Sequence, residues 1–477
     1  MSVKKKNLDA HLAEIFTQFI AIKDKDFKRS QEVFKSVFEN VKCKMEEQCN
    51  FFKKYSSQIM YAGSVYDSIK VSKLDEFDMD IVIRLPIDQK DETKKGIIME
   101  NDQPGFVKMK IIDSFDNLDK QPEWEKCHVV TKDWRDADKY FLQNKFRFWI
   151  HAIVQKALNN MNGEVIVNDV KYLLTYKESG PAFTLNIKNI EEKFYLDVDL
   201  VPVIRFQLPR WPEGYRTVES GPVKDWLVVP KPNKALKSDA LKNQCWRLSF
   251  QDFERDMMKG RQQLKTTIRL LKKLRDALDM NAIASYYIKT LFLWKIEAND
   301  KTYWQSKIST LFYTMVKELY DAIEKKNIRY YWHEDNNLIE GLKPSLQKIY
   351  LSKLDSVIKR IEANDVDAVV AALLTKSELQ EFQKSEFYQK QPVKESSDVK
   401  DGPSPSISVS RQVSAVNNFK ASNENYDDLL ARISILEEKV RRLEMAAMQN
   451  VSNKNNLPDI NNSDSRDSGV SSLIDFN

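Results

Sequence analysis

Three acidic residues at alternate positions are the part of the sequence best suited to chemistry. Glu76, Asp78 and Asp80 lie in the stretch 61–86, with apolar residues between them. Because alternate residues of a β-strand point to the same face, these carboxylates are expected to converge in front of an apolar backing. Their mutual repulsion is costly unless a cation lies between them, and Mg²⁺ binds oxygen ligands of this kind. The pattern therefore predicts a divalent-cation site.

A Gly-Ser turn and a second acidic strand extend this pattern. Gly63 and Ser64 precede the acidic stretch and can offer backbone N–H groups and a hydroxyl to phosphate oxygens. The segment 194–204, FYLDVDLVPVI, is a second apolar strand with Asp197 and Asp199 in alternation. If the two strands are neighbours in a sheet, the second strand provides a third carboxylate. Each feature alone is common by chance, but together they indicate nucleotidyl transfer.

We expect Glu76, Asp78 and Asp199 to be catalytic and to hold two Mg²⁺ or Mn²⁺ ions. Such ions bridge a triphosphate and an attacking hydroxyl, lower the pKa of that hydroxyl and stabilise the displacement of pyrophosphate. Gly63 and Ser64 would hold the phosphates. The adjacent pair Cys127–His128 has no CxxC partner, so it is not expected to bind metal.

Composition bounds the fold and its setting. The chain has 477 residues, 42% hydrophobic and 11% aromatic, so we expect a large core in one two-lobed domain followed by a tail. A formal net charge of +5 does not by itself indicate nucleic-acid binding. The basic N-terminus continues into an amphipathic pattern, so neither a secretory signal nor a membrane span is expected. Four cysteines without disulfide-type spacing fit a reducing, cytoplasmic location.

The hydrophobic pattern predicts both helices and strands. Residues 8–54 are typical of one or two long helices, and another helix is expected over 146–157. The segments 163–174 and 182–188 are predicted strands that lead into the second acidic strand. Residues 88–145 give no clear pattern. This order predicts an α/β fold.

Basic residues gather on one face of the N-terminal helices and in the loop 231–242. A solvated helix face explains such charge, and so does a surface that follows the phosphates of a duplex. The loop is a second candidate for phosphate contacts. The candidate RNA-binding residues are Lys23, Lys25, Lys28, Arg29, Lys42, Lys234 and Lys237.

Five segments resemble one known family. They are GSVYDSIKVSKLDEFDMDIVI from residue 63 onward, DVDLVPVI, CWRLSFQDFERDMM, IRLLKKLRD and SYYIKTLFLW. Within residues 55–345 they follow the order found in the cyclic GMP-AMP synthase and male-abnormal-21 group of nucleotidyltransferases. The chain most resembles the cyclic GMP-AMP synthase-like receptors of invertebrates, which are sensors that make a cyclic dinucleotide when they bind double-stranded nucleic acid.

The resemblance implies an α/β (α+β) fold with a mixed-sheet catalytic lobe and a helical C-terminal lobe. The boundaries are 1–54 for N-terminal spine helices, 55–245 for the catalytic lobe and 246–385 for the helical lobe. ATP and GTP would be the substrates. Arg247 and Ser249 would contact a guanine, because the Arg fork can bond O6 and N7 in parallel.

The helical lobe would supply the other nucleotide contacts. Tyr286 would stack on a base, and Lys289, one turn further on, would reach a phosphate. Lys272 aligns with a nucleotide-contacting lysine, with the adjacent Lys273 as the alternative, and Ser285 would be the N-cap of its helix. The full set of expected nucleotide-binding residues is Gly63, Ser64, Arg247, Ser249, Gln251, Glu254, Lys272, Ser285, Tyr286 and Lys289.

One departure from the family bears on the activator. The vertebrate DNA sensor of this family has a zinc-binding insertion of one His and three Cys after the WRLSF segment, whereas residues 251–271 here contain neither His nor Cys. We therefore expect no zinc and favour double-stranded RNA, which is recognised by shape and by backbone and 2′-hydroxyl contacts.

The C-terminal region changes in composition. Residues 386–424 are predicted to be a disordered linker and 450–477 a disordered tail. Between them, residues 425–449 predict a short coiled coil, which would self-associate or dock on the core. A homodimer could form through this helix or on the nucleic acid.

The sequence thus predicts a double-stranded RNA-activated innate immune sensor that makes a cyclic dinucleotide, cyclic GMP-AMP in the first instance, from ATP and GTP. Three alternatives stay open. The chain could be a catalytically silent male-abnormal-21-like scaffold, a DNA-activated enzyme, or a nucleotidyltransferase that releases linear products.

Overall fold

The computed structural model describes most of the first 390 residues. The described residues are 6–71, 74–87, 96–101, 103–122, 128–179, 182–217 and 221–390. The predicted coiled coil, the tail and the linker beyond residue 390 lie outside them.

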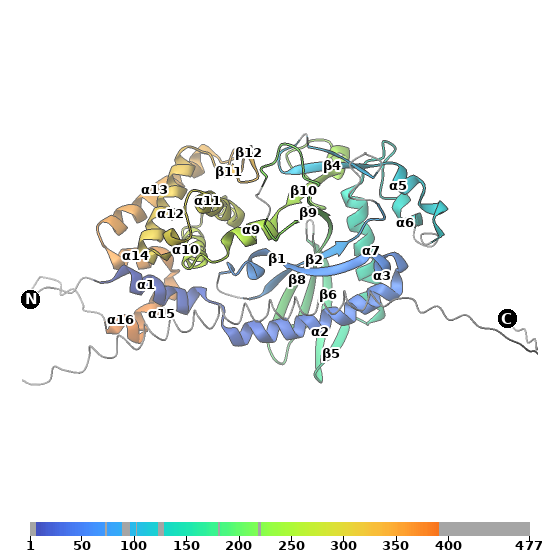
Figure 1. Cartoon of the computed structure of the whole chain (residues 1–477). Coiled ribbons are helices and arrows are strands. Elements are labelled where there is room, and N and C mark those ends of the chain that lie inside the picture. The colour runs from blue at the N-terminus through green and yellow to red at the C-terminus, as the bar shows by residue number, and fades with distance from the viewer. Residues whose placement is uncertain are drawn as a thin grey trace, which may run out of the picture. The chain divides into compact units, whose positions relative to one another are not determined.

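The N-terminal helices contact both halves of the fold. They are α1 (Leu8–Ile15), the π-helical turn η1 (Phe16–Ile20), α2 (Asp24–Gln48) and α3 (Asn50–Tyr55). In Figure 1, α1 lies beside the C-terminal helices and α2 crosses in front of the strands of the sheet. Phe34 of α2 is buried, and its ring contacts Phe77, the residue between the first two predicted metal ligands. The apolar stripe of the helix therefore packs against the back of the acidic strand.

A mixed sheet forms the catalytic half. Its strands are β1 (Ser56–Ala62), β2 (Glu76–Ile83), β3 (Ile97–Glu100), β4 (Phe106–Ile111), β5 (Glu164–Val167), β6 (Val170–Ser179), β7 (Ala182–Asn189), β8 (Phe194–Gln207), β9 (Asp225–Val229) and β10 (Cys245–Ser249). The main path runs β3-β4-β10-β9-β8-β7-β6-β5, and β2 joins β8 to β1. The β2–β8 pair is parallel and the other pairs of named strands in this sheet are antiparallel. Helix α7 (Gln143–Asn160) includes residues 146–157, which were predicted to be helical.

Two parts of the sheet differ from expectation. The strand predicted over 163–174 is a hairpin of β5 and β6, because Asn168 and Asp169 adopt φ values of 50° and 63°, as a tight hairpin turn requires. The region 88–145, which gave no prediction, contains β3 and β4. It also contains the short helices α5 (Asp113–Asp116), η2 (Leu118–Lys120) and α6 (His128–Lys132).

The second half of the described chain is helical. It comprises α9 (Gln251–Met258), α10 (Leu264–Ala277), α11 (Ser285–Glu297), η4 (Thr302–Gln305), α12 (Ile308–Glu324), α13 (Pro344–Glu362), α14 (Val366–Leu373), α15 (Lys376–Lys384), α16 (Glu386–Gln389) and the hairpin β11 (Arg329–Tyr330) and β12 (His333–Asn337). Helix α8 (Asp239–Gln244) precedes β10 and packs against α7 and β10, so it belongs to the catalytic half. Thr375 and Glu378 form a capping box that begins α15. Among the described residues, no helix is long and apolar enough to cross a membrane.

Both predicted boundaries of the helical lobe move. Strand β10 pairs with β4 and β9, so the sheet continues past residue 245 to Ser249. At the other end, helix α16 (Glu386–Gln389) lies beyond residue 385, where the helical lobe was expected to end. Its Tyr388 hydroxyl donates to Asp367 at 3.2 Å, and its Phe387 ring packs against Phe382. Residues 386–389 therefore belong to the helical half and not to a disordered linker.

Replacing Phe382 by Ala should test this C-terminal packing. The Phe382 side chain is fully buried and contacts the rings of Phe19, Phe387 and Tyr388. Because the change leaves a cavity, we expect the free energy of unfolding to fall by about 3–5 kcal/mol. Denaturant unfolding measures this, with Glu386→Ala, at an exposed position, as the control. A loss below about 1 kcal/mol would show that this packing is dispensable.

Candidate active site

The parallel pairing of β2 with β8 brings three carboxylates together. Glu76 lies beside Asp197, and Asp78 lies beside Asp199. One carboxylate oxygen from each of Glu76, Asp78 and Asp199 lies within 4.8 Å of the others. The predicted neighbourhood of the two acidic strands is confirmed. Three convergent carboxylates are a donor set that suits a hard divalent cation.

Burial and the repulsion of neighbouring carboxylates disfavour the charged forms of Asp78 and Asp199. Burial, followed by the charges of Glu76 and Asp199, raises the pKa of Asp78 to about 6. Burial also raises the pKa of Asp199, although the Thr184 hydroxyl donates a hydrogen bond to it at 2.5 Å. On the other side, Lys70 Nζ lies 3.0 Å from Glu76 Oε2. A divalent cation would supply the remaining positive charge, so the three residues fit Mg²⁺ or Mn²⁺.

The other two acids of the strands do not join the cluster. Asp80 was expected to converge with Glu76 and Asp78, and this expectation is wrong. It is 6% exposed and accepts a hydrogen bond from Gln251 Nε2 of α9 at 2.8 Å, while burial raises its pKa to about 7. Asp197 accepts a hydrogen bond from Asn186 at 2.5 Å. Asp80 is thus engaged by helix α9, through Gln251, and not by the carboxylate cluster.

Gly63 begins the short helix α4 (Gly63–Tyr66) directly against Asp78. Its φ is +68°, and a Cβ placed on it would lie 1.8 Å from Asp78 Oδ2. Both the backbone conformation and the close approach therefore require glycine. Strand β1 sets this contact, because Ala62 pairs with Asp78. The Gly-Ser turn and the carboxylate cluster consequently adjoin each other.

A cavity of about 380 Å³ opens beside this turn, between the sheet and the helices. Its size is in the range of small-molecule sites. The residues expected to bind nucleotides all line it: Gly63, Ser64, Arg247, Ser249, Gln251, Glu254, Lys272, Ser285, Tyr286 and Lys289. Among the other lining residues, Lys231 belongs to the basic loop 231–242, whereas Asp67 and Tyr330 carried no sequence signal that singled them out.

The structure distinguishes the two adjacent lysines of α10. Lys272 lines the cavity, and its Nζ donates to the carbonyl of Ile69 at 2.7 Å. Burial lowers its pKa to about 8. Lys273 forms an ion pair with Glu378 of α15 at 2.5 Å. Of the two, Lys272 is therefore the one placed to meet a ligand in the cavity.

Aromatic and polar groups meet at the helical end of the cavity. The Arg247 guanidinium lies 5.9 Å from the centroid of the Tyr286 ring, and the Tyr286 hydroxyl donates to Glu254 at 2.7 Å. The expectation that Ser285 is the N-cap of α11 is wrong. Ala284 holds the N-cap position, and Ser285 is the first helical residue, with a hydroxyl 3.2 Å from Arg275 Nη2.

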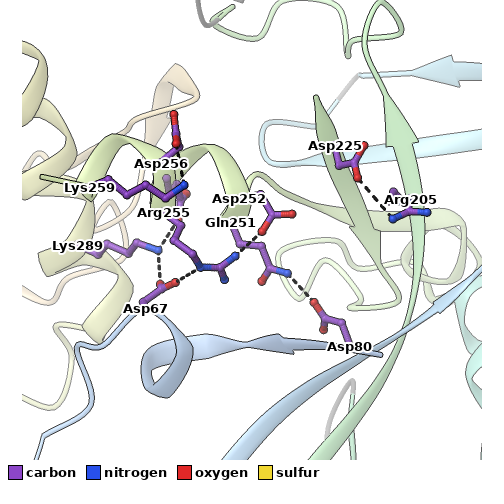
Figure 2. A network of polar contacts seen from close by, with 11 residues as sticks. Asp67, Asp80, Arg205, Asp225, Gln251, Asp252, Arg255, Asp256, Lys259 and Lys289 are labelled. Atoms are coloured by element: carbon purple, nitrogen blue, oxygen red, sulfur yellow. Dashed lines mark hydrogen bonds and ion pairs between the residues drawn. The ribbon is translucent and has the colours of Figure 1, made fainter. Parts of the chain in front are cut away.

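A buried network of charges underlies the cavity (Figure 2). Lys289 Nζ lies 2.6 Å from Asp67 Oδ2 and 2.7 Å from Glu254 Oε2. Burial opposes the charges of Glu254 and Lys289, but their mutual attraction outweighs it. The pKa of Glu254 is therefore lowered and that of Lys289 is raised. Arg255 approaches the other oxygen of Asp67 at 3.3 Å. Sequence reasoning missed Asp67, which lies in the GSVYDSIK segment without an independent signal.

The candidate RNA-binding residues lie on two surfaces. Lys23, Lys25 and Lys28 are exposed near the start of α2, as are Lys234 and Lys237 in the loop before α8. Arg29 forms an ion pair with Glu192, and Lys42 forms one with Glu46 at 2.7 Å within α2. The exposed lysines are therefore compatible with either of the two explanations that the sequence left open.

Comparison with known families agrees with this geometry. The chain matches the Mab-21 protein nucleotidyltransferase domain over residues 65–260 and the Mab-21 protein HhH/H2TH-like domain over residues 263–356. Together these matches cover strands β2 to β10, the carboxylate cluster and helices α9, α10 and α11, whereas β1 and the Gly63–Ser64 turn precede them. The fold is that of a Mab-21 nucleotidyltransferase domain followed by a helical domain.

Three insect relatives, each a cyclic GMP-AMP synthase-like receptor, are similar over most of the chain. The protein from Aethina tumida is 33% identical over 77% of this chain and 91% of its own length. The protein from Ctenocephalides felis is 32% identical over 80% and 91%, and that from Tribolium castaneum is 33% identical over 78% and 93%. The chain therefore belongs to the Mab-21 nucleotidyltransferase family that includes these cyclic GMP-AMP synthase-like receptors.

Replacing Gly63 by Ala should disrupt the site at its narrowest point. The added Cβ would displace either the turn or Asp78, so we expect nucleotidyl transfer to fall by about 100-fold or more. Gly341→Ala is the matched control, because nothing lies within 4 Å of a Cβ there. Initial rates of pyrophosphate release measure the effect. Equal rates for the two variants would contradict this account of the turn.

The raised pKa of Asp78 predicts pH-dependent metal affinity. A carboxyl group must lose its proton before it ligates a cation, so metal and proton compete for Asp78. We expect the Mn²⁺ affinity to be constant above about pH 7 and to fall by about tenfold per pH unit below about pH 6. Calorimetric titration measures this, and Asp78→Asn should weaken the dependence, leaving the part that comes from Asp199, whose pKa is also raised. A pH-independent affinity in the unmodified protein would show that Asp78 is not a ligand.

Proposed function

We propose that this nucleotidyltransferase is an innate immune sensor that is activated by double-stranded RNA and makes a cyclic dinucleotide, cyclic GMP-AMP in the first instance, from ATP and GTP. The observation that carries the proposal is the carboxylate cluster of Glu76, Asp78 and Asp199 beside one cavity that collects every expected nucleotide contact. The relatives' name as cyclic GMP-AMP synthase-like receptors supports the same product and a sensing role.

Each part of the cavity has a role in this proposal. Glu76, Asp78 and Asp199 hold Mg²⁺ or Mn²⁺, which would neutralise triphosphate charge and lower the pKa of the attacking ribose hydroxyl. The Gly63–Ser64 turn holds the phosphates through N–H groups and the Ser64 hydroxyl. Pyrophosphate leaves as the first phosphodiester bond forms. The linear intermediate then turns over in the cavity, and a second transfer closes the ring.

The helical end of the cavity orients the bases. Arg247 reads a guanine edge with two parallel hydrogen bonds, and Ser249 is two residues further along the same strand, on the same face. The Tyr286 ring offers a surface for base stacking, which does not depend on base identity. Gln251 and Glu254, one helical turn apart on α9, border the second nucleotide.

The proposed activator is duplex RNA, bound in the cytoplasm. Two groups of exposed lysines would contact phosphates without reading sequence. They are Lys23, Lys25 and Lys28 at the start of α2, and Lys234 and Lys237 in the loop before α8. The absence of His and Cys from residues 251–271 favours RNA over a zinc-dependent grip on DNA. Binding would shift the Gly63–Ser64 turn further toward the conformation that holds the phosphates.

Replacing both Glu76 by Gln and Asp78 by Asn should separate chemistry from RNA binding. The change removes two of the three carboxylates while keeping side-chain size, so synthesis should be abolished. The basic residues are untouched, so the affinity for duplex RNA should stay the same. Product analysis and a duplex-binding titration measure the two effects, and retained synthesis would contradict the metal assignment.

Product analysis decides among the candidate functions. Purified protein is mixed with ATP, GTP and Mg²⁺ or Mn²⁺, with no ligand, long duplex RNA or duplex DNA, and products are resolved by mass spectrometry. A cyclic dinucleotide that appears only with RNA is the expected result. Linear products, activation by DNA, or no product with any duplex would each favour the corresponding alternative function over this proposal.

A further inference from the structure

Three cations from three successive helices hold the segment that follows the Gly-Ser turn. Arg255 of α9 and Lys289 of α11 contact the Asp67 side chain, and Lys272 of α10 donates to the carbonyl of Ile69 at 2.7 Å. Figure 2 shows Asp67 between Lys289 and Arg255. The turn belongs to the catalytic half by sequence, but its side-chain anchors lie on the helical half.

Asp67 is the centre of this arrangement. It is 4% exposed, and each of its oxygens has a cationic partner: Lys289 Nζ lies 2.6 Å from Oδ2, and Arg255 Nε lies 3.3 Å from Oδ1. Glu254 and Asp252 pair with the same two cations from the other side. A buried carboxylate is tolerated only when its charge is matched in this way. The position of Asp67 is therefore tightly constrained.

The constraint on Asp67 extends to the metal site over a short path. The backbone N–H of Asp67 donates to the carbonyl of Gly63 at 3.2 Å, and Gly63 packs directly on Asp78. The ring of Tyr66, the residue before Asp67, lies 4.1 Å from the Arg255 guanidinium. A shift of Asp67 away from α9 and α11 would therefore move the turn that carries Ser64.

We propose that Asp67 is a positioning residue: its carboxylate fixes the Gly63–Ser64 turn to α9 and α11, and so keeps the phosphate-binding conformation populated before a nucleotide arrives. This rests on the proposed function, in which the turn holds the triphosphate. It also gives Lys289 a structural role, because its ammonium is held between two carboxylates.

The proposal predicts a specific kinetic signature for Asp67→Asn. Loss of the charge leaves the turn in its competent conformation for only a fraction of the time, and apparent affinity falls by that fraction. We expect KM for ATP and GTP to rise by about tenfold, with kcat at saturation within about threefold of the original. A merely structural defect would instead lower the active fraction, which reduces kcat and leaves KM unchanged.

Matched variants isolate the anchor from general charge effects. Asp256→Asn removes a carboxylate from α9, the helix that carries Arg255; Asp256 pairs with Lys259 at 3.0 Å, and the change should alter neither KM nor kcat. Asp67→Glu keeps the charge and should recover most of the lost affinity. Arg255→Gln removes one of the two partners of Asp67, so it should raise KM in the same direction. It also provides the test if Asp67→Asn does not fold.

Hydrogen exchange tests the anchor without any catalysis. In nucleotide-free protein, Asp67→Asn should speed amide exchange in peptides that cover residues 63–71 and leave α13 unchanged, whereas Asp256→Asn should change neither. If the unmodified protein makes no product but this difference is seen, the anchor stands and the proposed function fails. If exchange at 63–71 is unchanged in both Asp67→Asn and Arg255→Gln, or if KM stays constant while kcat falls, the proposal is overturned.

Discussion

The in-register parallel pairing of β2 with β8 is the constraint on which the rest of the site depends. It places Asp78 beside Asp199. Glu76 is two residues before Asp78 on β2 and therefore lies on the same face of the sheet. On the opposite face, Phe77 and Val198 are almost fully buried, so the apolar core holds the register. A slip of one residue would turn the acids into the core and the apolar side chains toward the cavity. The hydrophobic core therefore stabilises an arrangement of like charges that would not persist by itself.

The catalytic half is not sufficient to make the cavity. The sheet contributes Val229 of β9 and Arg247 and Ser249 of β10, while α9, α10 and α11 contribute further lining residues and the partners of Asp67. The buried charges of Asp67 and Lys289 match each other across the boundary between the halves. Because Gly63 lies against Asp78, the position of the helices bears on the phosphate turn and, through it, on the metal ligands. The cavity is thus a joint product of both halves.

The features that could be predicted from the sequence are those that depend on local residue patterns. Alternation identified the two acidic strands, and the order of motifs identified the family and the cavity-lining residues. Asp80 follows the same alternation but is separated from the cluster by Gln251, which is far away in the sequence, and strand periodicity carries no information about a covering helix. The hairpin at Asn168 and Asp169 did have a signal, since these residues favour positive φ, but the strand propensity around them concealed it. Asp67 had none, because its role depends on partners from α9 and α11.

Anomalous diffraction from crystals grown with Mn²⁺ and a non-hydrolysable ATP analogue would test the central claim most directly, namely that Glu76, Asp78 and Asp199 form the metal site beside the phosphate turn. The account predicts manganese peaks within coordination distance of these carboxylates, about 2.0–2.3 Å, with the triphosphate against Gly63 and Ser64. Manganese bound elsewhere, or a triphosphate that leaves the turn unoccupied, would contradict it.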